Sequence, residues 1–517
     1  MRVSGKVNAT IATSCAIAVV LVAAATATGD HDSSNASPGS PSSPASSRSA
    51  GPAGAQVTVP PAAVDVVASS SPAASSIAVS RRLFSSSPVA VLASSAAASG
   101  DAQRLAAEVA TALKVPVLLD DPGSPAELRR LEARTILTFG KTVAVPGGRA
   151  VPLTEAGVSD AVESVTIAAT APHQVTPDGP IVVTRSVSAN AAAVTTARNA
   201  GAEVLEVPTA DPRRSPAAAA ARAARPDAPV IAFGTPFVKG FAYSLDIVRK
   251  NVRQPHGGYL AMPGRHYVAM YGHPGMPSLG VLGEQGVKGT VERVKRLVRK
   301  YEAVGGKGRF IPTFEIISTV ASSSAGKDKN YSQESPIKTL RPLIDAAGKA
   351  GVYVILDLQP GRTNFLTQAK RYRSLLELPN VGLALDPEWR LKKKQRHLRQ
   401  IGSVSVEEIN RTGDWLARLT RERSLPQKLF VLHQFATSMI KHRGRLDTAH
   451  PELATVLHVD GSGPQGAKQG TWKVLHRDAP AGVFWGWKNF VDEDKPMLDV
   501  RQTWRKVKPR PELVTYQ

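Results

Sequence analysis

The chain has 517 residues, 42% of them hydrophobic, a formal net charge of +22 at pH 7 and one cysteine. This length allows two or three domains, and a single cysteine excludes a fold held by disulfide bonds within the chain. Residues 1–254 carry 22 Lys+Arg and 18 Asp+Glu, whereas residues 255–517 carry 42 and 24. The basic C-terminal half favours anionic partners such as wall polymers, lipid headgroups or nucleic acid, and a generally basic domain is the alternative.

The first 27 residues have the pattern of a signal peptide. Arg2 and Lys6 precede an apolar run over residues 11–25, and Ala25-Thr26-Ala27 forms an A-x-A cleavage site. Cys15 lies too early in this run to be a lipoprotein cysteine, so we expect a secreted, extracellular mature chain without cysteine. A retained membrane anchor is the alternative, and no later segment is apolar enough to span a bilayer.

Residues 28–75 are dominated by Ser, Ala, Pro and Gly and contain few bulky apolar residues. Such a segment cannot bury enough apolar surface to fold, so we predict a disordered linker. The linker would let the folded part stand away from a membrane or reach through a wall layer.

Two similar units follow within residues 76–240. Expected strands of the first unit lie at 88–94, 115–122 and 135–140, with helices at 100–110 and 126–133 between them. The second unit repeats this order, with strands at 180–186, 202–208 and 229–234 and helices at 189–200 and 216–224. Alternating strands and helices predict parallel sheets covered by helices.

This order of elements and the sequence of the first unit resemble the cell wall-binding repeat 2 family of surface proteins. The matching stretches are VLASSAAASGDAQRLAAEVATALKVPVLL (91–119), whose helix begins at an acidic residue after the first strand, and the strand TILTFG (135–140). Members of the family often carry three tandem repeats, of which two are readable here. The resemblance implies Rossmann-like repeats that bind cell-wall polysaccharide or another anionic wall polymer, and hence a cell-wall-associated protein.

Residues 255–517 alternate strands and helices again. Seven stretches have the composition of strands: 266–271, 310–317, 352–358, 381–386, 429–435, 453–459 and 482–487. Apolar residues recur every three or four positions at 291–301, which predicts an amphipathic helix, and further helices are expected at 337–350, 366–376 and 406–423. This alternation predicts a (β/α)-barrel or barrel-like domain, for which no eighth strand is evident, and an open doubly wound sheet is the alternative.

Acidic side chains lie at the ends of several expected strands, where barrel enzymes place their catalytic groups. Glu315 lies near the end of the second strand, Asp357 ends the third, and Asp386 and Glu388 end the fourth. Residues two apart on a strand share a face, so one carboxylate of the last pair can hold the other protonated. We predict Glu388 as general acid and Asp386 as the group that tunes it, with Glu315 and Asp357 as further acid/base or orienting groups. A structural salt bridge is the alternative for each acid.

The segment GLALDPEW (382–389) resembles the active-site strand of glycoside hydrolase families 18 and 25, in which an apolar strand ends in D-x-E. This resemblance implies carboxylate acid/base catalysis on a glycosidic bond. The family 18 motif has further aspartates upstream on the same strand, where this chain has Gly382 and Ala384.

Nine further residues near strand ends are expected to bind the substrate: His273, Gln359, Trp389, His433, Gln434, His458, Asp460, Trp485 and Trp487. Indole faces stack on sugar rings, and ordinary packing is the alternative for any tryptophan. His433, His458 and Asp460 could ligate a metal, but their spacing is non-specific, so we expect no metal and no cofactor. No segment resembles a nucleic-acid-binding module, so no nucleic-acid partner is expected.

Two functions fit these features. The first is a secreted, wall-associated enzyme whose barrel hydrolyses a glycan. The second is a non-catalytic surface protein whose degenerate barrel only binds wall polymer. A basic run at 389–399 follows the acid pair, and it would either form a solvated face or guide an anionic polysaccharide toward the cleft.

Overall fold

The computed structural model describes residues 54–517 except 61, 70, 146, 155–162, 164–178, 307 and 309. The expected signal peptide and residues 28–53 of the expected linker lie outside the described residues. Residues 54–75, which their composition assigns to the linker, contain strands β1 (Gln56–Val57) and β2 (Val64–Val67) and the start of helix α1 (Pro72–Leu83). The segment VDVV of β2 is ordered because it pairs with a strand far along the chain, a contact that local composition does not reveal.

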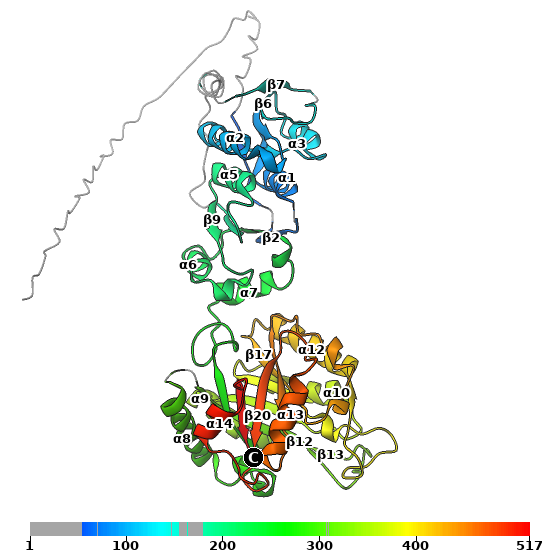
Figure 1. The fold of residues 1–517 in the computed structure, drawn as a ribbon. Coiled ribbons are helices and arrows are strands. Elements are labelled where there is room, and N and C mark those ends of the chain that lie inside the picture. The colour runs from blue at the N-terminus through cyan, green and yellow to red at the C-terminus, as the bar shows by residue number, and fades with distance from the viewer. Residues whose placement is uncertain are drawn as a thin grey trace, which may run out of the picture. The chain divides into compact units, whose positions relative to one another are not determined.

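Two four-stranded parallel sheets form the N-terminal part of the described chain, drawn in blue to green in Figure 1. The strands are β4 (Val89–Ala93), β5 (Val117–Leu119), β6 (Thr135–Phe139), β7 (Arg149–Pro152), β8 (Ile181–Thr184), β9 (Glu203–Glu206) and β10 (Val230–Phe233). One sheet has the order β5-β4-β6-β7 and the other the order β9-β8-β10-β2. Each unit therefore places its second, first and third strands in the same order, as expected for two Rossmann-like repeats.

Each sheet is completed by a strand that precedes the other unit. β7 lies just before the second unit and pairs with β6 of the first, whereas β2 precedes the first unit and pairs with β10 of the second. Leu92 and Leu118 of the first unit also share a buried core with Val182 and Ile231 of the second. The helices of this part are α1, α2 (Gly100–Leu113), α3 (Ser124–Arg130), α5 (Ala191–Asn199), α6 (Pro216–Ala224) and α7 (Phe241–Arg249), and β3 (Phe84–Ser86) pairs with β1.

Within residues 255–517, of which only 307 and 309 are undescribed, eight parallel strands close into a barrel. They are β11 (His266–Gly272), β12 (Phe310–Ala321), β14 (Tyr353–Leu358), β15 (Val381–Leu385), β17 (Lys428–His433), β19 (Leu453–Val459), β20 (Phe484–Asn489) and β21 (Leu513–Tyr516). Their order is β11-β21-β20-β19-β17-β15-β14-β12, and pairing of β12 with β11 closes the ring. The closed ring confirms the expected barrel and excludes the open doubly wound sheet.

The eighth strand, β21, consists of four residues at the end of the chain. It lies between β20 and β11, where Leu513 is in register with Gly486 and Tyr516 with Met270. Because β21 is short and follows the proline-containing segment 508–511, it shows no alternation long enough to predict a strand.

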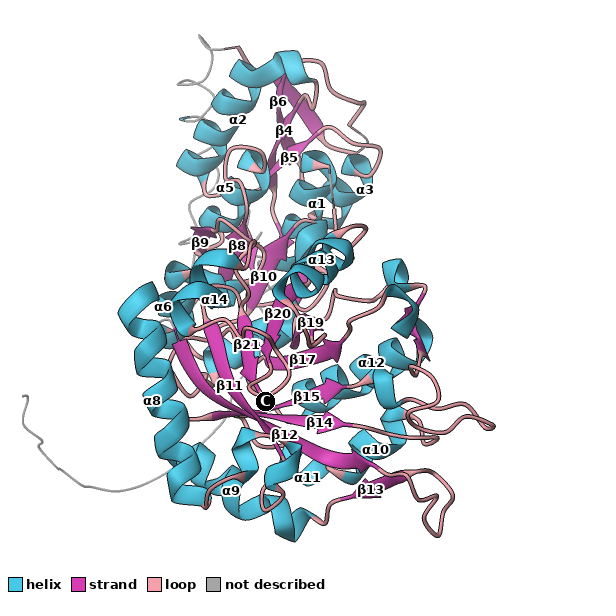
Figure 2. Ribbon diagram, turned by 60° about the horizontal axis from the view of Figure 1, so that its bottom comes forward, coloured by secondary structure: helices cyan, strands magenta, loops and turns pink. Residues whose placement is uncertain are grey.

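The barrel helices lie outside the strands, as Figure 2 shows for α8 and α12. Their bounds are α8 (Val287–Gly305), α9 (Ile337–Ala350), α10 (Phe365–Arg371), α11 (Arg373–Leu376), α12 (Val406–Glu422), α13 (Gln465–His476) and α14 (Val500–Lys506). Val294, Val298 and Tyr301 form the buried stripe of α8, at the spacing predicted for an amphipathic helix. Short strands β13 (Ser332–Glu334), β16 (Val404–Ser405) and β18 (Ile440–Lys441) lie in the loops. In the part of the chain that is described, no helix combines the length and apolar character that crossing a membrane requires.

The barrel interior changes from apolar to polar along the strands. An apolar cluster fills its middle: Tyr267, Ala269, Ile311, Tyr353, Ile355, Ala384, Leu429, Val431, Ala454, Val456 and Leu513. Alternate residues of a strand share a face, so the next inward position lies two residues further on. These next positions form a polar layer at the carboxyl ends: Tyr271, Glu315, Asp357, Asp386, His433, His458, Lys488 and Thr515. The candidate site is built on this layer.

Candidate active site

The strand register places members of the polar layer directly beside one another. Tyr271 is opposite Glu315, His433 is opposite His458, and Lys488 is opposite Thr515. Every member of the layer is buried. Ionisable groups so deep in a barrel must compensate each other's charges, because burying an unpaired charge is costly.

His433 is the centre of the hydrogen-bond network. Its Nε2 donates to Oε1 of Glu315 at 2.8 Å, and its Nδ1 donates to Oδ2 of Asp460 at 2.9 Å. Two ring nitrogens that both donate to carboxylates define a protonated imidazolium. Burial alone would lower the pKa of His433, but the surrounding carboxylates, that of Asp357 first, raise it well above its ordinary value.

Glu315 and Asp460, the two acceptors of His433, are held ionised. Burial alone would raise the pKa of Glu315, but the charge of His433 and the hydrogen bond that it donates help to lower the pKa to about 2. Oε2 of Glu315 also accepts a hydrogen bond from Thr515 at 2.9 Å. Burial likewise opposes ionisation of Asp460, but the charge of His433 and its hydrogen bond lower the pKa of that carboxyl. His458 stays neutral, because burial lowers its pKa to about 3.

The pKa values of Asp357 and Asp386 are shifted upward, opposite to those of Glu315 and Asp460. Oδ2 of Asp357 accepts a hydrogen bond from the Tyr271 hydroxyl at 2.7 Å, and burial raises the pKa of this carboxyl. Burial also raises the pKa of Asp386 well above its ordinary value, and the charges of Asp357, Asp460 and Glu388 add to this effect. Both carboxyls therefore hold a proton more tightly than an exposed aspartate does.

The acid pair at the end of β15 is arranged differently from the sequence expectation. The strand ends at Leu385, and Pro387–Trp389 form a short 3-10 helix that Asp386 caps by accepting a hydrogen bond from the Glu388 backbone N–H at 3.1 Å. Pro387 suits the first position of this helix, because its ring fixes φ and no N–H is required there. The two acids therefore do not share a strand face, yet both line the same cavity.

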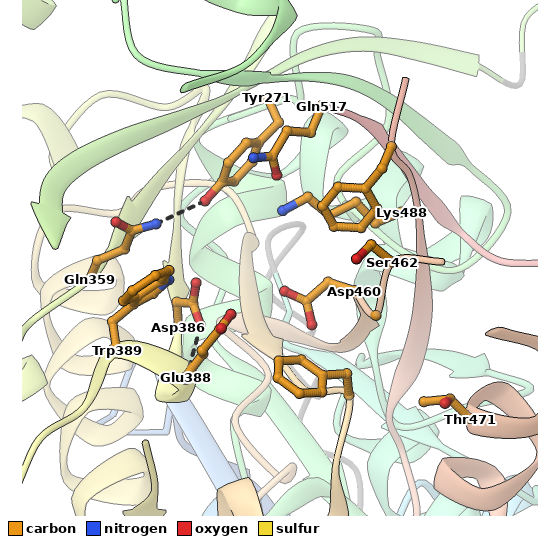
Figure 3. A pocket seen from close by; sticks show the side chains of 13 residues that line it. Tyr271, Gln359, Asp386, Glu388, Trp389, Asp460, Ser462, Thr471, Lys488 and Gln517 are labelled. Atoms are coloured by element: carbon orange, nitrogen blue, oxygen red, sulfur yellow. Dashed lines mark hydrogen bonds between the residues drawn. The ribbon is translucent and has the colours of Figure 1, made fainter. Parts of the chain in front are cut away.

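This cavity has a volume of about 420 Å³ and opens above the polar layer. It is lined by Tyr271, Gln359, Asp386, Glu388, Trp389, Phe435, Asp460, Gly461, Ser462, Thr471, Lys488, Phe490 and Gln517. Figure 3 shows the side chains of Glu388, Asp460 and Lys488 converging on the cavity. Its size lies in the range of small-molecule sites, roughly 300–1,000 Å³, and its aromatic and charged lining can bind polar rings.

Glu388 combines access to the cavity with a perturbed pKa. Burial raises the pKa of Glu388 to about 7, and the charge of Asp460 contributes, although Lys488 and His433 oppose the rise. The side chain is partly exposed to the cavity, not sealed beneath it. Glu388 can therefore hold a proton near neutral pH where a ligand can reach it.

The other residues predicted from the sequence divide into three groups. Gln359, Trp389 and Asp460 line the cavity together with the acid pair. Glu315, Asp357, His433 and His458 lie in the polar layer beneath it. The remaining four lie outside the cavity lining: His273, Gln434, Trp485 and Trp487.

These four residues have other contacts. Nε2 of His273 lies 2.8 Å from Oγ of Ser335, and Oε1 of Gln434 accepts a hydrogen bond from Arg443 at 3.0 Å. The Trp485 ring stacks on His476 with centroids 3.5 Å apart, and the buried Trp487 ring packs against Trp472 at 5.6 Å. Both tryptophans face the helices, because they alternate along β20 with the inward-pointing residues.

The sequence places Lys488 at the end of the seventh strand without giving it a role, and it does not point to Tyr271, Phe435, Phe490 or Gln517 in the lining. Nζ of Lys488 lies 3.6 Å from the centroid of the Tyr271 ring, which holds the ammonium group at the cavity wall. The alternation of inward and outward side chains along β20 could have identified Lys488. Lys488 is two residues beyond Gly486 and four beyond Phe484, which packs on the barrel interior.

Two sets of side chains at the site have ligand atoms close enough to hold a metal ion. Atoms of Glu315, His433 and His458 lie within 4.8 Å of one another, and so do those of Asp386, His433 and Asp460. Both sets use His433, whose two nitrogens already donate to carboxylates. A metal would have to displace these hydrogen bonds, because a metal-binding imidazole needs a free lone pair.

The fold and site define an α/β protein in which Rossmann-like parallel sheets precede an eight-stranded TIM-type barrel. No family model matches the chain, and no curated protein matches it. Among solved structures, the chain is weakly similar to Cwp6 from Clostridium difficile, with 11% sequence identity and a TM-score of 0.18. That alignment covers 91% of this chain and 65% of Cwp6, so the chain spans about two thirds of the length of that protein.

Proposed function

We propose that the barrel is a glycoside hydrolase of a cell-wall glycan, with Glu388 as general acid and Asp460 as its ionised partner. The observation that carries this proposal is that the two carboxyls line one cavity with pKa values shifted in opposite directions, Glu388 upward and Asp460 downward. Paired acids whose environments separate their pKa values are the equipment of glycosidic bond cleavage.

In this reaction the proton of Glu388 passes to the glycosidic oxygen as the bond to the anomeric carbon breaks. Asp460 then either attacks that carbon or takes a proton from the water that does so. Glu315 acts through His433, which it orients toward Asp460. Asp386 fixes the backbone turn that carries Glu388, and Asp357 fixes the Tyr271 hydroxyl.

The cavity wall suits a carbohydrate. The Trp389 indole lies beside Glu388 in the lining and offers a face on which a sugar ring can stack. Gln359 and Lys488 supply hydrogen-bond donors for hydroxyl groups. The export signal and the resemblance of residues 91–119 to wall-binding repeats support a secreted protein whose N-terminal units bind wall polymer.

The test is the release of reducing ends from purified wall glycans by the mature chain. The Glu388→Gln variant keeps the side-chain shape but cannot donate the proton, so it should lose activity by about 10²- to 10⁴-fold with little change in glycan binding. Glu292→Gln, at an exposed position of α8, is the matched control and should retain full activity. Equal activity of the two variants would remove Glu388 from the mechanism.

A non-catalytic wall-polymer-binding protein is the second candidate. The excess of 42 Lys+Arg over 24 Asp+Glu in residues 255–517 favours it, because this charge attracts anionic polymers without any turnover. In such a protein Glu388→Gln would change glycan affinity modestly, and the wild-type chain would release no reducing ends from any wall glycan.

A further inference from the structure

A second cavity, also about 420 Å³, adjoins the candidate active site at the carboxyl ends of β14 and β15. Its lining includes Arg362, Arg390, Lys392, Lys393, Ser405 and Glu408. Four of them are cationic and one is acidic, so the cavity is strongly positive.

Two chain segments connect the cavities. After β14, Gln359 lines the active-site cavity and Arg362 lines the second one; after β15, Trp389 lines the first and Arg390 the second. A β-bridge between Gly361 and Arg390 joins the two segments. The two cavities therefore share the wall that these segments form, and the side chains of Trp389 and Arg390 line its two sides.

Only part of the positive charge is neutralised. Glu408 accepts two hydrogen bonds from Arg390, at 2.9 and 3.2 Å, and this pair balances itself. Among the described residues, no carboxylate pairs with Arg362, Lys392 or Lys393. The Arg362 guanidinium lies 4.5 Å from the centroid of the Tyr331 ring and donates to a backbone carbonyl, contacts that position it without cancelling its charge.

A further lysine, Lys441, adds to the excess of positive charge at the second cavity. Lys441 is in register with Ser405 of the cavity wall through the pairing of β16 with β18. The proximity of Lys441 lowers the pKa of Lys392. Two adjacent ammonium groups without a carboxylate repel each other, and an anion placed between them relieves that repulsion.

We propose that this second cavity is a subsite for an anionic group, a carboxylate or a phosphate, carried by the glycan whose bond lies at Glu388. The inference rests on the proposed function, and it assigns the substrate to the anionic polysaccharides. The guanidinium of Arg362, fixed by its bond to the Gln395 carbonyl, contributes charge to the cavity wall, and Lys392 and Lys393 act as point charges around the anion. His397 holds this basic loop against the site, because its ring packs on Trp389 with centroids 5.2 Å apart.

The test measures binding of three oligosaccharide probes to the full mature chain: a hyaluronan hexasaccharide with carboxylates, a poly(glycerol phosphate) oligomer and neutral chitohexaose. The double variant Lys392→Gln, Lys393→Gln should weaken binding of an anionic probe by about tenfold or more and leave the neutral probe unchanged. The probe with the larger loss identifies the anion as carboxylate or phosphate. Lys349→Gln, Lys506→Gln removes two exposed lysines from α9 and α14 and should change neither affinity.

The outcomes separate this inference from the proposed function. On a cleavable anionic glycan, the double variant should raise KM with little effect on kcat, because the subsite contacts a group away from the reacting bond. A wild-type chain that prefers neither anionic probe over chitohexaose, or a double variant that behaves like its control, would overturn the subsite. A chain that cleaves no glycan but keeps the anionic preference would remove only the hydrolase.

Discussion

Replacing His433 tests whether one imidazolium holds the buried acids of the barrel together. In the His433→Gln variant, Glu315 and Asp460 lose the cation that both of them contact. Removing one partner of a buried ion pair costs about 3–5 kcal/mol, so we expect the barrel to be destabilised by at least about 3 kcal/mol.

The pH dependence of this loss has a definite sign. The folded pKa of Glu315 lies below its ordinary value, so its contribution is present above pH 4.5 and is lost as the pH falls toward 2. The folded pKa of His433 lies above its ordinary 6.5, so its contribution is present below pH 6.5 and is lost as the pH rises through the folded value. The difference in unfolding free energy between wild type and variant should therefore be largest between pH 4.5 and 6.5.

Urea unfolding followed by tryptophan fluorescence measures this difference for the barrel alone, because all six tryptophans lie within residues 389–504. His450→Gln is the matched control, since His450 also contacts an aspartate, Asp414, at 2.9 Å, but with side chains 15% and 48% exposed. An exposed pair contributes no more than about 1 kcal/mol. If His433→Gln cost no more than His450→Gln, the imidazolium would not be the compensating charge.

Three further predictions concern the site and the architecture. The kcat/KM for glycan hydrolysis should fall as the pH rises through about 7, because Glu388 must be protonated to act, and a rate that is flat from pH 5 to 9 would contradict this. A chain ending at Arg510 lacks β21 and leaves β20 and β11 unpaired, so circular dichroism and fluorescence should report an unfolded barrel; native spectra would show that β21 is dispensable. Limited proteolysis should cut near 250–260 and release one unit that extends from β2 to α7 and a second unit, 255–517, whereas a resistant species that never separates there would count against two domains.

The seven barrel strands that the sequence predicted share a property that the missed strands β2 and β21 lack. Those of the barrel from β11 to β20 are apolar runs of five or more residues, each bounded by turn or helix signals, and local pattern identifies them. β2 and β21 have only four residues each, and both depend on strands distant in the sequence. Long-range pairing of this kind leaves no periodic signal at the segment itself.

The sequence predicted which strand ends carry site residues, but it did not predict which face of each strand points into the barrel. Asp386, Glu388 and Asp460 follow apolar runs, and the cavity contains all three. Alternation shows that Trp485 and Trp487 share one face of β20 and Lys488 the other, but it does not say which face points inward. That choice depends on the closure of the barrel, which the sequence predicted without its eighth strand.

The number of charges in the site gives the physical reason why we propose Glu388, among its five acids, as the proton donor. Five acids, namely Glu315, Asp357, Asp386, Glu388 and Asp460, surround two cations, His433 and Lys488. Two anions balance two cations in a medium of low dielectric constant, so the other three acids are driven to keep their protons. Asp357 is sealed beneath the cavity, and Asp386 is bonded to the turn below Glu388. Glu388 alone among the three has both a partly exposed carboxyl and a pKa near 7, so it can release its proton to a ligand and recover it from solvent.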